Sequence, residues 1–80
     1  MATATTGLNW AARGGLGTLI ARIDGDRDRL VIDHDPARGE CSWFLTWFHA
    51  DRHPNGLVLQ SDTEAHYLKT YATTWMGDDE

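Results

Sequence analysis

Two histidines separated by three residues are the first candidates for chemistry in this chain. On a helix, the i and i+4 spacing of His49 and His53 would let both imidazoles reach one metal ion. On a strand that leads into a turn, the two side chains would not converge. The intervening Ala50-Asp51-Arg52 does not match the glutamate-containing zincin motif. We therefore expect solvated or hydrogen-bonding histidines, no metal site and no cofactor.

The possible nucleophiles have no neighbour in the sequence that would activate them. Cys41 is the single cysteine, so it cannot form an intramolecular disulfide, and its aromatic surroundings predict a buried, inert thiol. The two serines, Ser42 and Ser61, fit a strand position and a helix cap. A chain of 80 residues also has little room for a deep pocket. These features predict a protein that is not an enzyme and has no catalytic residue.

Two loops carry incomplete ligand-binding motifs. Aspartates alternate with other residues in 24–29, as in a calcium-binding loop, but Arg29 stands where that loop needs glycine. Three glycines lie within residues 14–17, without the Gly-Lys-Ser/Thr of a phosphate-binding loop. We expect a polar turn at the first site and a flexible turn or bulge at the second.

The aromatic stretch Cys41–Ala50 is the element around which the rest of the chain must fold. It contains two of the four tryptophans and both phenylalanines, and its pattern permits a strand or a helix. Its short length, its composition and the turn-forming residues that bound it favour the strand. A strand would place Trp43, Leu45 and Trp47 on one face and Phe44 and Phe48 on the other.

Shorter apolar segments complete a sheet. Thr18–Ile23 and Leu30–His34 predict a β-hairpin, and Asn55-Gly56 predicts a turn before a last strand at 57–60. Residues 8–17 fit either a short first strand or a loop.

One helix is expected after the strands. Ser61 and Glu64 form a capping box, and apolar residues then recur on one face from Ala65 to Trp75. Gly77 is expected to end this helix. The sequence therefore predicts an α+β fold: an antiparallel sheet of four or five strands in hairpins, followed by one C-terminal helix packed on one face. The domain would span 8–76, between a flexible tail at 1–7 and an acidic tail at 77–80.

Such a sheet has two faces and one helix to cover them. Phe44, Phe48, Ile20 and Val31 would lie on the second face, which the segment around Trp10 or another molecule must cover. We expect this face to bind a protein partner or, in a homodimer, a second copy of the chain. The expected role is that of a small accessory or inhibitory protein of phage or actinobacterial type.

Net charge and composition limit the classes of partner and the cell compartment that we expect. The net charge of −5 disfavours a protein whose main task is to bind nucleic-acid phosphates, and it suits a partner protein with a basic surface. The lone cysteine, the lack of a membrane-length apolar run and the lack of a secretion signal predict a cytoplasmic protein without membrane contact.

The arginines supply an alternative function. Arg22, Arg27 and Arg29 lie in the first hairpin, where a sheet could lay them against DNA or RNA. The order of strands, then a helix that opens with SDTEAHYLKTYA, is similar to small phage and actinobacterial β-β-β-α modules, and resembles the arm-binding domains of tyrosine integrases. The resemblance covers residues 18–75 as a pattern and implies a sheet laid on the major groove. Those domains are basic, whereas aspartates accompany the arginines here.

Overall fold

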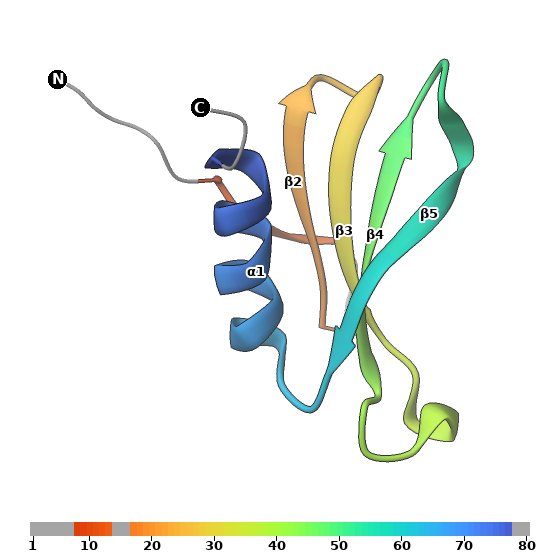
Figure 1. Ribbon diagram of the computed structural model, residues 1–80, viewed down its shortest axis with the longest axis vertical. Helices are drawn as coiled ribbons and strands as arrows, with labels where there is room; N and C mark the ends of the chain where they lie inside the picture. The colour runs from red at the N-terminus through yellow and green to blue at the C-terminus, as the bar shows by residue number, and fades with distance from the viewer. Residues whose placement is uncertain (1–7, 14–16, 78–80) are drawn as a thin grey trace, which may run out of the picture.

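Each strand of this chain pairs with the next one, and a helix follows the last strand (Figure 1). The computed structural model describes residues 8–13 and 17–77. One antiparallel sheet contains, in chain order, β1 (Ala11–Arg13), β2 (Thr18–Asp24), β3 (Asp28–His34), β4 (Trp43–His49) and β5 (His53–Asp62). The 3-10 helix η1 (Pro36–Arg38) separates β3 from β4, and α1 (Ala65–Gly77) packs against β3, β4 and β5. The predicted α+β fold is confirmed.

Three predictions concern residues outside the described ranges. They are the flexible tail at 1–7, the acidic tail beyond Gly77, and the glycines at 14 and 15. Within the described residues, α1 is neither long nor apolar enough to span a lipid bilayer.

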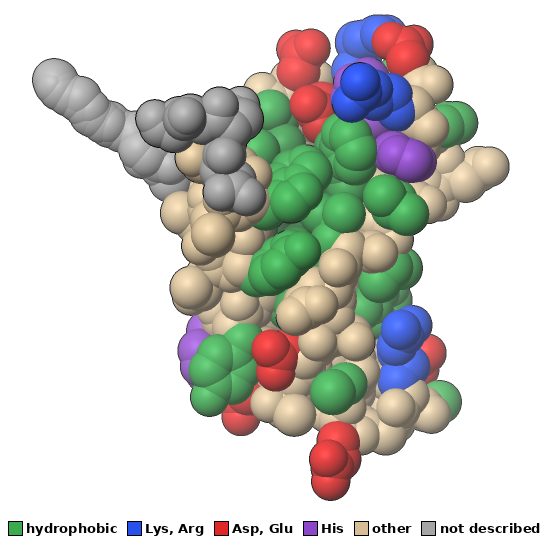
Figure 2. Space-filling model, viewed as in Figure 1, with side chains coloured by type: hydrophobic (Ala, Val, Ile, Leu, Met, Phe, Trp, Pro, Cys, Tyr) green, Lys and Arg blue, Asp and Glu red, His purple; other side chains and the backbone are tan. Residues whose placement is uncertain are grey.

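The helix-facing side of the sheet contains the apolar core. Leu30, Ile32 and Leu45 from the sheet meet Leu68 and Ala72 from α1, and all five side chains are fully buried. Full burial of each Leu or Ile stabilises the fold by about 1.5–3 kcal/mol. Large, partly buried side chains surround this cluster, and apolar surface gathers between α1 and the β5 edge (Figure 2). The large, partly buried side chains around the core include Leu8, Trp10, Leu19, Ile23, Trp43, Trp47, Leu59, Trp75 and Met76.

The aromatic stretch is a strand, as predicted. β4 pairs with β3 along its whole length, from His34 opposite Trp43 to Asp28 opposite His49. Alternation along β4 sends its tryptophans to the helix side and its phenylalanines to the other side. Trp10 packs on the helix side, so the N-terminal segment does not cover the second face through this residue.

The turn between β4 and β5 differs from the prediction. The chain reverses at Ala50–Arg52, and Asn55-Gly56 lies inside β5, where the register against β4 shifts. Gly56 has a φ of +92°, and a Cβ there would lie 2.8 Å from both the Phe48 ring and the Thr46 methyl group. Asn-Gly therefore forms a bulge that lets an aromatic ring cross the β5 backbone.

The predicted start of the helix is also wrong. Ser61 pairs with Phe44 in the sheet, so it is the last residue but one of β5 and not a helix cap. Pairing with the first residues of β4 extends β5 to Asp62, and α1 begins at Ala65. Ladder pairing thus prevailed over a local capping motif, because the sheet supplied a partner strand for these residues.

Candidate anion-binding face

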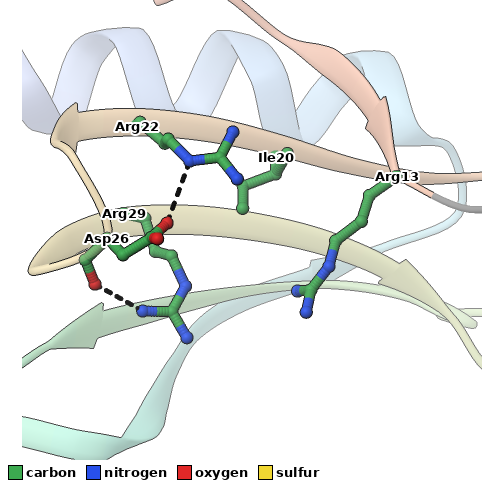
Figure 3. A pocket seen from close by; sticks show the side chains of 5 residues that line it. All are labelled: Arg13, Ile20, Arg22, Asp26 and Arg29. Atoms are coloured by element: carbon green, nitrogen blue, oxygen red, sulfur yellow. Dashed lines mark hydrogen bonds and ion pairs between the residues drawn. The ribbon is translucent and has the colours of Figure 1, made fainter.

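Residues that the sequence assigned to two different functions lie together on the side of the sheet opposite α1. On neighbouring strands there, Arg22 pairs with Arg29, and Arg29 pairs on its other side with Phe48. Ile20 pairs with Val31. Figure 3 shows several of these side chains in front of the sheet, with the helix behind it. We call this side the open face. It contains Arg13, Thr18, Ile20, Arg22, Arg29, Val31, Asp33, Phe44, Thr46 and Phe48 from the strands, together with Asp26 of the β2–β3 turn and Arg38 of η1.

Of the four apolar residues expected at the surface of the open face, Ile20 and Val31 are buried, and Phe44 and Phe48 are half-buried. Ile20 and Val31 are 4% and 2% exposed, although α1 packs on the other side of the sheet. Ile20 instead lies at a hollow of about 330 Å³ whose other lining residues are Arg13, Arg22, Asp26 and Arg29 (Figure 3). Long arginine stems bury apolar surface while their charged ends stay in water. Long side chains that surround an apolar residue can therefore reduce its exposure on a sheet face that no helix packs against.

The two phenylalanines of the open face are each covered by an arginine. The guanidinium carbon of Arg29 lies 4.5 Å from the centre of the Phe48 ring, and that of Arg38 lies 4.5 Å from the centre of the Phe44 ring. Such cation–π contacts stabilise by about 0.5–1 kcal/mol at exposed sites. They leave flat guanidinium groups facing solvent over the sheet.

The hollow concentrates positive charge around one carboxylate. Arg22 and Arg29 face each other on neighbouring strands, an arrangement that costs free energy because like charges repel. The Nε of Arg22 donates to Oδ1 of Asp26 at 3.0 Å, and Nη1 of Arg29 donates to the backbone oxygen of Asp26 at 2.7 Å. The hydrogen bond and the charge of Arg22 lower the pKa of Asp26, and the charges of Arg29 and Arg13 contribute to the same effect.

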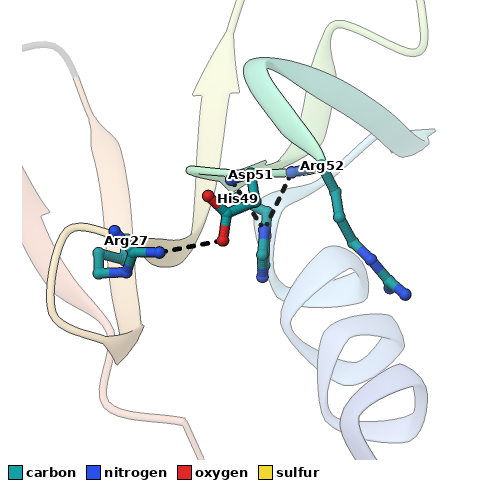
Figure 4. Close-up of polar contacts among 4 residues, drawn as sticks. All are labelled: Arg27, His49, Asp51 and Arg52. Atoms are coloured by element: carbon teal, nitrogen blue, oxygen red, sulfur yellow. Dashed lines mark hydrogen bonds and ion pairs between the residues drawn. The ribbon is translucent and has the colours of Figure 1, made fainter.

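Arg27 does not join this site. Its Nη2 donates to Oδ2 of Asp51 at 3.0 Å, which links the β2–β3 turn to the β4–β5 turn (Figure 4). The backbone reinforces that link, because the Ala50 amide donates to the Arg27 oxygen at 2.7 Å. Of the three predicted nucleic-acid contacts, Arg22 and Arg29 therefore share the hollow and Arg27 has a structural role at the end of the sheet.

Sequence reasoning missed two arginines of the open face. Arg13 comes from β1, and a definite strand assignment for residues 11–13 would have placed it beside Thr18. Arg38 comes from η1, and no feature of the sequence connects it to Phe44. A turn brings it there, since the 3-10 helix folds back beside the start of β4.

The two histidines flank the β4–β5 turn. His49 and His53 lie opposite each other across the hairpin, and Nδ1 of His49 accepts from the amides of Asp51 and Arg52 at 3.2 and 3.1 Å (Figure 4). Both imidazoles also lie beside the Trp47 ring. In residues 8–13 and 17–77 no three His, Cys, Asp or Glu side chains are placed to hold a metal ion.

The structure also places the cysteine and the aspartates of the 24–29 loop. Cys41 is exposed and not buried, because β4 begins only at Trp43 and leaves the thiol in the preceding loop. The aspartates of the calcium-like loop diverge, since Asp26 contacts Arg22 whereas Oδ1 of Asp28 accepts from Nε1 of Trp47 at 2.7 Å.

The open face offers guanidinium donors for an anion and flat surfaces for stacking. The chain matches no family model, no curated protein and no solved structure.

Proposed function

We propose that this protein binds single-stranded nucleic acid through the open face of its sheet. One observation carries the proposal: Arg13, Arg22, Arg29 and Arg38 gather there against two carboxylates, Asp26 and Asp33, in a chain of net charge −5. Charge is therefore segregated, and the local field of the face is opposite in sign to that of the whole chain. A partner with a basic surface would be repelled there.

The type of cation also matters. A guanidinium presents a rigid fork of donors that matches phosphate oxygens, so arginines suit a backbone with repeated phosphates. The guanidinium groups over Phe44 and Phe48 supply planes on which unpaired bases can stack. Phosphate contact and base stacking together favour a single strand over a duplex, whose bases are already stacked.

The test is an anisotropy titration of a labelled single strand and of the matching duplex at two salt concentrations. We expect the single strand to bind more tightly, with affinity that falls as salt rises. Arg22→Ala and Arg29→Ala should each weaken binding and lower the slope of log affinity against log salt by about 1.

Arg52→Ala is the matched control, because it removes the same charge from the β4–β5 turn and not from the open face. It should change affinity less than either open-face variant. Absence of binding, or equal losses for Arg22→Ala, Arg29→Ala and Arg52→Ala, would contradict the proposal.

We also propose that the chain self-associates through β5. This ten-residue strand lies at the edge of the sheet, where Leu57 and Val58 are 41% and 50% exposed. An exposed edge strand with apolar side chains can add a strand from a second copy. The predicted homodimer would then use an edge and leave the open face accessible.

Light scattering over a range of protein concentrations tests self-association. Val58→Lys should shift the mass to that of a monomer, because a charge on an edge strand opposes strand addition. Thr73→Lys on the exposed side of α1 is the control and should keep the dimer. A monomeric wild-type chain at every concentration would refute this second candidate.

A further inference from the structure

We infer that Asp26 is an internal competitor for a phosphate site formed by Arg13, Arg22 and Arg29. A phosphate of the ligand would enter the hollow and displace the Asp26 carboxylate from Arg22. The identity of the ligand rests on the proposed function, whereas the competition rests on the geometry of the hollow.

Three neighbouring strands contribute the cations of this hollow. Arg13 comes from β1, Arg22 from β2 and Arg29 from β3, and Ile20 lies among them (Figure 3). The fourth charged group, Asp26, comes from the turn between β2 and β3. Three positive charges and one negative charge leave an excess of two positive charges around one cavity. A single carboxylate therefore does not neutralise the cluster, and an anion of the ligand finds a favourable field.

The Asp26 carboxylate is held weakly enough to be displaced. Its one ion pair, among the described residues, uses Nε of Arg22, and the two side chains are 80% and 52% exposed. Exposed pairs of this kind contribute little to stability because water screens them. A phosphate has more acceptor oxygens than a carboxylate, so it can contact several guanidinium groups at once.

The turn that carries Asp26 does not depend on its carboxylate. Arg29 bonds the backbone oxygen of Asp26 at 2.7 Å, and the Arg27 amide donates to the Asp24 oxygen at 3.0 Å. Gly25 provides the positive φ of +57° that the reversal needs. The side chain can therefore rotate into solvent while β2, β3 and the two arginines keep their positions.

The inference predicts that removal of the negative charge strengthens binding. Asp26→Asn keeps the size and an acceptor oxygen of the side chain but removes its charge. Loss of one like charge about 5 Å from a bound phosphate, in water-like screening, corresponds to roughly 4-fold tighter binding. Arg13→Ala should weaken binding in both the wild-type and the Asp26→Asn background, because Arg13 lines the hollow.

The matched control is Asp51→Asn. It changes the net charge by the same amount and breaks an equally short ion pair, that of Arg27 with Asp51, outside the hollow. Affinity is measured with a labelled oligothymidine, and with inorganic pyrophosphate followed by the NMR signal of the Arg22 Nε–H group. We expect Asp26→Asn to bind both probes more tightly than the wild type and than Asp51→Asn.

The outcomes separate this inference from the proposed function. If oligothymidine binds but Asp26→Asn and Asp51→Asn behave alike, the competition is wrong and nucleic-acid binding stands. If pyrophosphate binds more tightly to Asp26→Asn but oligothymidine binds to no variant, the hollow stands and the nucleic-acid function fails. Weaker binding by Asp26→Asn, or no binding of either probe, would overturn the inference.

Discussion

The two faces of the sheet bury their apolar side chains by different means. On one face, Leu45 and Ile32 are fully buried beneath the apolar side of α1. On the open face, Ile20 and Val31 are almost as well buried, and arginine side chains surround Ile20. Burial by a helix excludes charge, whereas burial by arginine stems brings charge to the surface.

With the proposed function, this difference would let a small domain combine a core with a binding surface. An arginine stem contributes to stability through its methylene groups, while guanidinium donors that make no bond within the protein can bind a ligand. On the helix side, the fully buried cluster consists of apolar side chains that contact one another. We therefore expect substitutions in the helix-side core to change mainly stability. Substitutions of open-face arginines should change both stability and the proposed binding.

The largest effect is expected from a cavity on the helix side. Leu45→Ala should lower the free energy of unfolding by about 2–5 kcal/mol, because it removes a fully buried side chain from the centre of the core. Chemical denaturation measures the change. Tyr67→Ala, at a half-exposed position of α1, is the control and should cost much less. Equal losses would show that the helix-side cluster is not the main core.

Gly56 of β5 lies against Phe48 and Thr46 of the open face, and its replacement should have the next largest effect. Gly56→Ala combines strain at φ +92° with a Cβ 2.8 Å from the Phe48 ring, for a loss of roughly 2–4 kcal/mol. Gly25→Ala has a positive φ of +57° but no atom within 4 Å of the added Cβ, so it should cost only the strain. A smaller loss for Gly56→Ala than for Gly25→Ala in thermal unfolding would contradict the close approach.

Arg29 tests whether stem and charge have separate roles. Arg29→Ala should lower stability by about 1 kcal/mol, because it uncovers the open face and removes the contact with Phe48. Arg29→Met keeps an apolar stem, so it should retain more of that stability while losing the same binding of nucleic acid. Denaturation measures the stability of both variants, and anisotropy measures their binding. An Arg29→Met variant as unstable as Arg29→Ala would contradict this interpretation.

The smallest effect concerns the pH dependence of stability. Arg22 lowers the pKa of Asp26 in the folded state, so this carboxylate stabilises the fold above the pKa it has when unfolded. That contribution is lost as the pH falls through the lowered pKa of the folded state. Urea unfolding at neutral pH and at about pH 3 should show a slightly smaller acid-induced loss for Asp26→Asn than for the wild type. A larger loss for the variant would contradict the sign.

Local patterns of the sequence determined much of the fold and part of the site. Period-two alternation in 18–23 and in Cys41–Ala50 predicts the strands, and it also places Arg22, Phe44 and Phe48 on faces opposite their apolar neighbours. The polar connection at 24–29 predicts the first hairpin. Such features depend on residues close in sequence, so the sequence alone is sufficient for them.

Only the tertiary structure decided how these faces combine. The register of β2, β3 and β4 brings Arg22, Arg29 and Phe48 into one row, and folding of β1 and η1 adds Arg13 and Arg38. The same long-range pairing places Ser61, the predicted helix cap, in β5, and it places Asn55-Gly56 in a bulge of that strand and not in a turn. Strand register is set by contacts between residues far apart in the chain, because each strand gains its hydrogen bonds and its burial from a neighbour.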